Sequence, residues 1–367
     1  MNKNVNKEKP FEYLKRKDGT AFSSETVNNM YVARAYVLDK LKGVAICQGS
    51  KEQLRVVITS DSPLMLAVAR QVALSAHYAN YDEKSPIRTV ITIVSRNAQI
   101  IEELEKEEYL CNLPSYCMIS VNGNAPKNED SHVDIELRLI EEWNGDDNGM
   151  AVVMSEDDVK AFIATKKEAD IYSIDTRKAV MANRIYSLGS WIDNLPDEDS
   201  HGPERYALAL NVFQNNLLRE PTSPMIDPKR WASDLTTVKN GLSSVFCADC
   251  FESRAAGIKS YAKANGITEK EAWEECIEGL SKSEHARWVA EKLIMGFRPL
   301  SEQERLKNEC MFGEERRQYR NVLKKNAQDP AHIDICSFAD LRRVSPHDMK
   351  YDSFLMLAIP GILKKLR

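Results

Sequence analysis

Between residues 54 and 108, short apolar runs alternate with longer helical patterns. The runs at 54–59 and 87–94 are rich in β-branched residues, which is typical of buried strands. Residues 64–79 are apolar nearly all round and follow Pro63, as expected of a helix that packs against a sheet. With a second helix expected at 97–108, this order predicts an α/β fold with a parallel sheet and right-handed crossovers.

The rest of the chain extends this plan into four parts. A polar arm and a helix at 24–41 occupy residues 1–50, and a Rossmann-like α/β domain is expected over 51–175. A mostly helical bridge should cover 176–279, and a helical domain 280–367. We expect further strands at 116–121, 133–139 (alternating, as in an edge strand), 151–154 and 171–174. We expect further helices at 155–167 (with Ser155 as N-cap), 175–191, 205–218, 231–240 and 244–265.

The first strand–helix turn is where a Rossmann-like domain would bind phosphates. This chain has Ser60-Asp-Ser-Pro63 there, without the usual glycines, so side chains would crowd a pyrophosphate and Asp61 would repel it. Ser60, Ser62 and Arg96 are the candidate contacts to an NAD(P)-type cofactor, but a scaffold without cofactor is favoured. An enzyme that processes NAD(P) or nucleotides at these strand ends stays an alternative.

A second informative stretch is the predicted helix at 280–296. Ser281 and Glu284 form a capping-box pattern, and Gly296 fits a left-handed C-terminal cap. His285 and Trp288 share one face of this helix, where an ordinary core helix would carry Leu or Ile. A flat aromatic ring beside donor groups favours a binding face, although a buried polar pair would show the same pattern.

The blocks Glu-His-x-Arg-Trp, Glu-Lys-Leu-x-x-Gly-Phe, His-x-Asp-x-x-x-Phe-x-x-Leu and Tyr-Asp follow one another from residue 284 to 352. This pattern resembles the RyR domain, named from ryanodine receptor repeats and also found in bacterial proteins. The chain departs from it at Ile333, where many members have proline, and in an insertion at 300–330. The resemblance implies a site for a nucleotide-derived ligand such as an ADP-ribose derivative, formed here by His285, Arg287, Trp288, His332, Asp334, Tyr351 and Asp352.

The strand–helix order of 55–97 is loosely similar to the nucleotide-binding domains of bacterial Trk-type potassium-uptake regulators. That resemblance implies a regulatory subunit of an ion channel or transporter as a further alternative. A membrane protein or another effector would then be the partner.

Composition excludes several other classes. The 367 residues are 43% hydrophobic and 29% charged, as in an ordinary globular protein. A net charge of −5 argues against a nucleic-acid partner, and the basic run at 314–325 is interpreted as a solvated helix face. Eight scattered cysteines, with a single Cys-x-x-Cys at 247–250, predict neither a zinc site nor a disulfide framework.

We expect a cytoplasmic protein, because no apolar run of about 18 residues and no signal-peptide pattern is present. The favoured hypothesis is a non-catalytic sensor in stress or anti-phage signalling. Its α/β domain would be a scaffold and the assembly surface of a homo-oligomer, and its RyR-like domain would bind the ligand.

Overall fold

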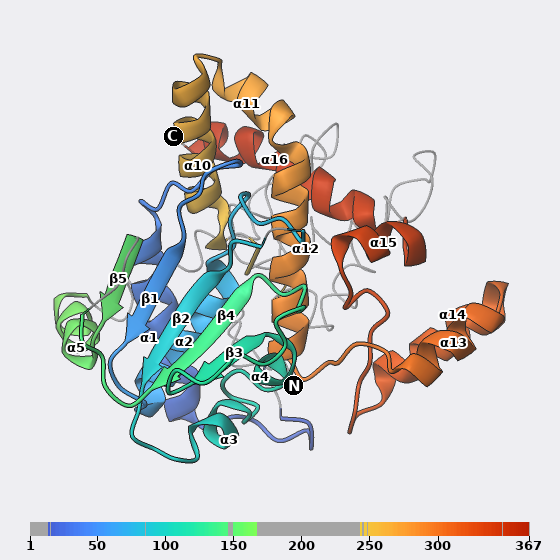
Figure 1. Cartoon of the computed structure of the whole chain (residues 1–367), viewed down its shortest axis with the longest axis horizontal. Helices are drawn as coiled ribbons and strands as arrows, with labels where there is room; N and C mark the ends of the chain where they lie inside the picture. Colours follow the sequence, from blue (N-terminus) through green and yellow to red (C-terminus); the bar gives the residue numbers. More distant parts are fainter. Residues whose placement is uncertain are drawn as a thin grey trace, which may run out of the picture.

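The computed structural model describes residues 14, 16–84, 86–145, 150–166, 243, 246–247, 249–346 and 348–366. Within them, a parallel sheet lies beside a set of helices from the C-terminal part of the chain (Figure 1). The predictions of a strand at 171–174 and of helices at 175–191, 205–218 and 231–240 lie outside the described residues. None of the described helices has a segment long and apolar enough to cross a bilayer.

The sheet has five strands in the order β3-β4-β2-β1-β5, and all neighbouring pairs are parallel. The α/β class and the parallel sheet are therefore confirmed. The strand bounds are β1 Leu54–Ile58, β2 Thr89–Val94, β3 Met118–Val121, β4 Ile135–Ile140 and β5 Met150–Met154.

Strand β4 is not an edge strand, so that prediction is wrong. It pairs with β2 on one side and with β3 on the other. Its alternation has another cause: Leu137 and Leu139 face the buried core, while Glu136 and Arg138 lie on the opposite face and pair with each other at 2.6 Å. The strand order reverses between β1 and β5, and the carboxyl ends of these two strands flank the usual ligand crevice of an α/β sheet.

Helices α1 (Ser24–Leu41) and α2 (Pro63–Ser75) pack against each other and against the apolar face of the sheet, behind it in Figure 1. Both helices were predicted, and α2 is buried almost all round. It ends four residues earlier than expected. The carbonyl oxygens of Ala73 and Ala76 are bound by the side chains of His77 and Thr89, so these oxygens do not accept hydrogen bonds from a further turn of the helix.

The helix after β2 is also shorter than expected. Helix α3 covers only Ile100–Leu104, because the backbone N–H groups of Leu110 and Cys111 donate back to the carbonyl of Leu104. A four-residue helix that the sequence did not indicate, α4 (Leu113–Tyr116), follows. Helix α5 (Glu156–Thr165) begins at the predicted cap, where Ser155 Oγ accepts from the N–H of Asp158.

Seven helices are described after residue 250. They are α10 Phe251–Asn265, α11 Glu269–Glu275, α12 Ile277–Ile294, α13 Glu302–Cys310, α14 Gly313–Lys325, α15 Phe338–Val344 and α16 Met349–Leu366. Helices α13 and α14 form the insertion at 300–330 and project from the body (Figure 1).

Helix α12 begins at Ile277, not at the predicted capping box. Ser281 lies one turn inside the helix, where its hydroxyl donates to the carbonyl of Ile277, and Glu284 is fully buried. The other end is as predicted, because Gly296 has a left-handed backbone with φ +83°. Residues Val289, Leu293 and Ile294 join the core of the sheet, while Leu280 joins a second core with α10, α11 and α16. Helix α12 thus crosses the predicted domain boundary at residue 280 and contributes to both cores.

Candidate ligand site on helix α12

Helix α12 carries two different polar faces. Glu284, Arg287 and Glu291 follow each other at helical spacing on one face and are almost completely buried. His285, Trp288 and Lys292 follow the same spacing on the adjacent face, where Trp288 and Lys292 are partly exposed. The helix therefore separates the predicted site residues into two groups.

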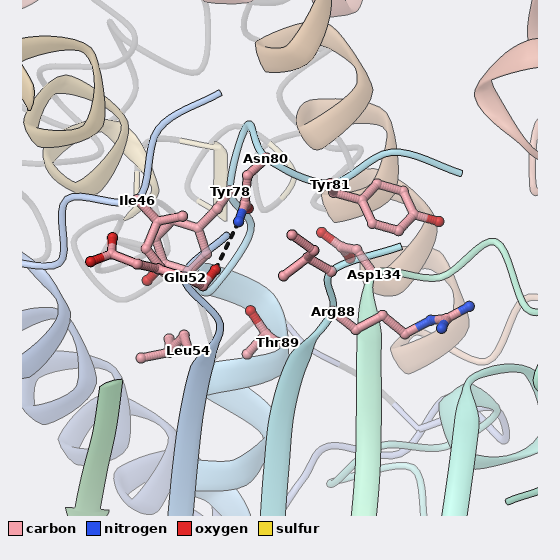
Figure 2. Close-up of a pocket in the computed structure, with 10 residues that line it drawn as sticks. Ile46, Glu52, Leu54, Tyr78, Asn80, Tyr81, Arg88, Thr89 and Asp134 are labelled. Atoms are coloured by element: carbon pink, nitrogen blue, oxygen red, sulfur yellow. Dashed lines mark hydrogen bonds between the residues drawn. The ribbon is translucent and has the colours of Figure 1, made fainter. Parts of the chain in front are cut away.

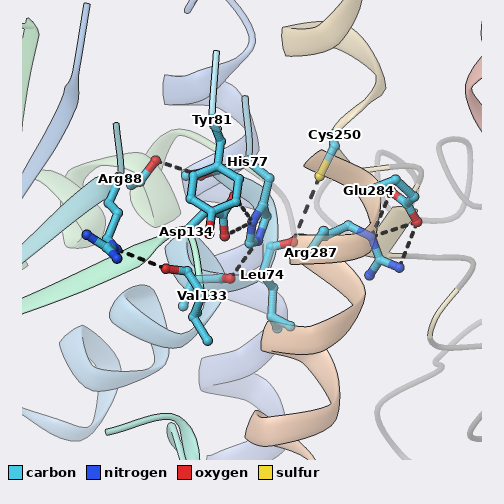
Figure 3. Close-up of polar contacts among 12 residues, drawn as sticks. Leu74, His77, Tyr81, Arg88, Val133, Asp134, Cys250, Glu284 and Arg287 are labelled. Carbon is cyan, nitrogen blue, oxygen red and sulfur yellow. Dashed lines mark hydrogen bonds and ion pairs between the residues drawn. The ribbon is translucent and has the colours of Figure 1, made fainter. Parts of the chain in front are cut away.

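The buried group is a chain of ion pairs. Arg287 donates to Glu284 (Figure 3). It also donates to Glu291, and Arg254 of α10 donates to Glu284 at 2.8 Å. Burial raises the pKa of Glu284, but the charges of Arg287 and Arg254 outweigh it and lower this pKa to about 2. Arg287 is 1% exposed, and its guanidinium is engaged by Glu284 and Glu291. The structure does not bring it to the other predicted ligand contacts, and its geometry is that of a structural ion pair.

The second group begins with His285, which is held from two sides. Its Nε2 lies 2.9 Å from the carbonyl oxygen of Cys336, so this nitrogen carries the proton, and its Nδ1 lies 3.6 Å from Asp352 of α16. Burial lowers the pKa of His285, but Asp352 and the Cys336 carbonyl outweigh it and raise the pKa above its usual value. The imidazole stacks on Trp288 with ring centroids 6.3 Å apart. Tyr351, half-buried in the first turn of α16, precedes Asp352 in the chain.

Trp288 lies between two further groups. The His332 ring meets the indole edge-on, with centroids 5.0 Å apart, and Lys292 Nζ lies 5.3 Å from the indole centroid. His332 Nδ1 accepts from the N–H of Asp334, so its Nε2 carries the proton of the neutral ring. The Asp334 carboxylate is fixed by the hydroxyl of Ser345 at 2.6 Å. The structure thus brings His285, Trp288 and His332 together as predicted.

Two cations that the sequence analysis assigned to a solvated face also face this group. Arg320 and Lys324 lie one turn apart on α14 and are partly buried. Burial lowers the pKa of His332 well below its usual value, and Lys324, Lys292 and Arg320 lower it further. Burial lowers the pKa of Lys324 as well, and its ammonium makes no hydrogen bond or ion pair with any described residue. In the sequence, the four-residue spacing of Arg320 and Lys324 within the basic run indicates that both side chains lie on the same face of a helix.

The strand–helix turn of the α/β domain has a different character. Asp61 accepts from Ser95, and Ser60 Oγ lies 3.4 Å from Glu156, which follows β5. Ser62 stands at the N-cap of α2. These residues place two carboxylates at the switch point, where a dinucleotide would need donors.

Arg96 does not compensate for these carboxylates. It pairs with Glu142 at the surface, where both side chains are 77% exposed. The geometry favours the scaffold without a cofactor over the NAD(P) alternative.

The opposite edge of the sheet holds a small polar pocket, lined by Tyr78, Asn80, Arg88 and Asp134 among others (Figure 2). Its volume of about 10 Å³ leaves room for roughly one water molecule. Asp134 is bound to His77 at 2.9 Å, and Arg88 donates to the carbonyl of Val133 (Figure 3). Arg88 also donates to two further backbone carbonyls. These hydrogen bonds satisfy polar groups at the amino ends of the strands, and we interpret them as structural.

The described residues contain no group of three His, Cys, Asp or Glu side chains placed to hold a metal ion. All eight cysteines are free thiols. Cys247 and Cys250 are buried, and burial raises the pKa of Cys250 to about 12, as for structural cysteines.

We compared the chain with protein-family models, with curated proteins and with solved structures, and none of them matches.

Proposed function

We propose that the C-terminal part of this protein binds a small anionic, nucleotide-derived ligand of the ADP-ribose type. The observation that carries the proposal is the convergence of Lys292, Arg320 and Lys324 on the partly exposed Trp288 and His332. The three cations come from two helices, and Lys324 has an ammonium that no described residue uses.

Each group suits one part of such a ligand. The indole of Trp288 offers a flat surface for a base, and Lys324 and Arg320 offer charge for phosphates. The neutral His332 can donate from Nε2 to a hydroxyl or a phosphate oxygen. A nucleotide with two phosphates fits this set better than a nucleoside, because the Lys324 ammonium has no carboxylate partner among the described residues, while Lys292 already pairs with Glu291 at 2.7 Å.

The resemblance of residues 284–352 to the RyR domain supports the same class of ligand. We propose that this binding step belongs to a cytoplasmic sensor of stress or anti-phage signalling that assembles as a homo-oligomer. Arg287 has no direct contact in this proposal. Its ion pairs with Glu284 and Glu291 lie within α12, and Arg254 of α10 joins the same cluster through Glu284.

The test is thermal unfolding of the full chain with ADP-ribose, ADP and adenosine. A ligand at about 100 times its dissociation constant stabilises the folded state by about 2.7 kcal/mol. We expect Lys324→Gln to weaken ADP-ribose binding by about 10- to 100-fold, because a charge-assisted hydrogen bond contributes about 1.5–3 kcal/mol.

Lys325→Gln is the matched control, since Lys325 is the exposed neighbour of Lys324. Equal ADP-ribose affinities of the two variants would refute the site, and unchanged unfolding temperatures with all three compounds would refute the ligand class.

The two rival functions have less support. An enzyme at the strand ends would use Ser60 and Asp61, which are engaged with Glu156 and Ser95. Recovery of NAD, NADP and ADP-ribose unchanged after incubation with the protein is the result that the sensor hypothesis requires. No contact of the described residues favours the regulator of an ion channel or transporter.

A further inference from the structure

Helix α10 carries a buried guanidinium that is only partly used. Arg254 lies in the first turn of α10, and its side chain is 1% exposed. Its Nη1 donates to Glu284 at 2.8 Å, which fixes the group against α12. The other two nitrogens, Nε and Nη2, are buried and have no hydrogen-bond partner among the residues that the structure describes. The proposed nucleotide site does not use Arg254.

These two nitrogens form the edge with which an arginine binds two oxygens at once. The N–H of Nε and one N–H of Nη2 point in the same direction in the plane of the guanidinium. Arg34 uses this edge in the same protein, because its Nε and Nη2 each donate to one oxygen of Asp249 at 2.7 Å. Arg254 presents the same edge without an acceptor from the described residues. A buried charged donor without an acceptor is costly, so the edge indicates a partner with two oxygens.

The ion pairs around Arg254 leave an excess of positive charge. Glu284 is the one carboxylate of the described residues that binds Arg254, and Arg287 shares it. Glu291 continues the chain of ion pairs and binds Arg287 and Lys292. Among the described residues, three cations therefore share two carboxylates in this cluster.

The other groups near Arg254 do not supply the second negative charge. Burial raises the pKa of Cys247 well above its usual value and that of Cys250 to about 12, so both thiols are neutral near pH 7. Asp249 belongs to the same segment, but Arg34 holds both of its oxygens. The described part of the chain therefore offers no anion to this edge of Arg254.

We propose that the Nε–Nη2 edge of Arg254 binds a small anion with two oxygens on one atom, a carboxylate or a phosphate. The planar edge matches such a group through two parallel N–H···O bonds, which a chloride ion or a neutral hydroxyl cannot reproduce. Arg287 holds Glu284, and Glu284 holds Nη1 of Arg254, so the edge is oriented before the anion binds.

The experiment is thermal unfolding of the full chain in acetate, in inorganic phosphate and in chloride at equal ionic strength. We expect acetate, phosphate or both to raise the unfolding temperature saturably above its value in chloride, with half-saturation at about 1–10 mM. A rise with acetate alone identifies the carboxylate class, a rise with phosphate alone identifies the phosphate class, and a rise with both shows that the edge accepts either. No rise with either anion overturns the proposal.

Three variants locate the bound anion. Arg254→Lys keeps a positive charge beside Glu284 but lacks the planar edge, so the half-saturating concentration should increase at least about tenfold. Lys259→Gln is the matched control, because Lys259 is exposed on the same helix, and it should leave this concentration unchanged. Lys324→Gln should also leave it unchanged, since Lys324 belongs to the proposed nucleotide site. Wild-type anion affinity in Arg254→Lys overturns the proposal, and a loss confined to Lys324→Gln assigns the anion to the nucleotide site instead.

Hydrogen exchange of the wild-type protein decides the question if Arg254→Lys does not fold. The stabilising anion should slow amide exchange in α10 relative to chloride. Slower exchange confined to α14, which carries Lys324, overturns the proposal. Because the two sites lie on different helices, ADP-ribose binding can succeed or fail independently of this result.

Discussion

Arg34 of α1 and Asp249, 215 positions later, form a bidentate ion pair in which neither side chain is exposed. Both donor–acceptor distances are 2.7 Å, and Gln71 of α2 also donates to Asp249. The pair fixes the start of the C-terminal helices against the first helix of the chain. A link of this kind holds only if both partners are present, because each alone is an uncompensated buried charge.

Replacement of Asp249 therefore tests this link. We expect Asp249→Asn to lower the free energy of unfolding by about 3–5 kcal/mol, because the Arg34 guanidinium stays buried without its counter-charge. Urea unfolding followed by circular dichroism measures the loss. Asp39→Asn is the control, since Asp39 pairs with Lys42 on the same helix at the surface and should cost about 0–1 kcal/mol. A similar small loss for both variants would contradict the role of the pair.

The sheet was predictable because its strands are short, apolar and separated by helical patterns. The position of β4 inside the sheet was not, because Glu136 and Arg138 look like the solvent side of an edge strand and instead pair with each other. Similarly, Ser281 and Glu284 match a capping box, but the helix begins at Ile277 after Cys276, whose side chain makes no cap hydrogen bond and so gives no sequence signal.

The site was predictable only in part. His285, Trp288 and His332 meet because a later segment of the chain returns to helix α12. The division of α12 into a buried face with Arg287 and an open face with Trp288 depends on what packs on each side, and Arg254 supplies one of those contacts from α10. The contribution of Arg320 and Lys324 depends on the direction in which α14 returns to the body, which spacing alone does not give.

His332 should make stability depend on pH with a definite sign. Its pKa is well below the usual value in the folded state, so below about pH 6.5 the unfolded chain binds a proton that the folded protein does not. Wild-type stability relative to His332→Gln should therefore fall by about 1.4 kcal/mol for each pH unit below 6.5. Urea unfolding of both proteins from pH 8 to pH 5 checks this. A difference that does not change with pH would show that His332 titrates normally.

His285 should show the opposite sign. Asp352 and the Cys336 carbonyl raise its pKa above the usual value, so the folded state holds a proton that the unfolded state releases. The resulting stability is fully present below about pH 6.5 and is lost as the pH rises through the folded-state pKa. Wild-type stability relative to His285→Gln should decrease from pH 6 to pH 9 in the same unfolding measurement. An increase over this range would mean that burial outweighs Asp352.

Gly257 should be required for close packing of α10 and not for its backbone conformation. A Cβ at this position would lie 2.6 Å from the carbonyl oxygen of Ile46, a backbone atom that cannot move aside alone. Alanine in a helix interior normally stabilises by about 1 kcal/mol relative to glycine. A gain in stability would therefore mean that helix propensity dominates, and a loss would mean that the close contact with residue 46 dominates. We expect Gly257→Ala to destabilise by about 1–3 kcal/mol, the usual cost of overpacking, as measured by thermal unfolding. Gly43→Ala, where a Cβ meets nothing within 4 Å, should change stability by no more than about 0.5 kcal/mol. A stabilised Gly257→Ala protein would show that α10 does not approach residue 46 this closely.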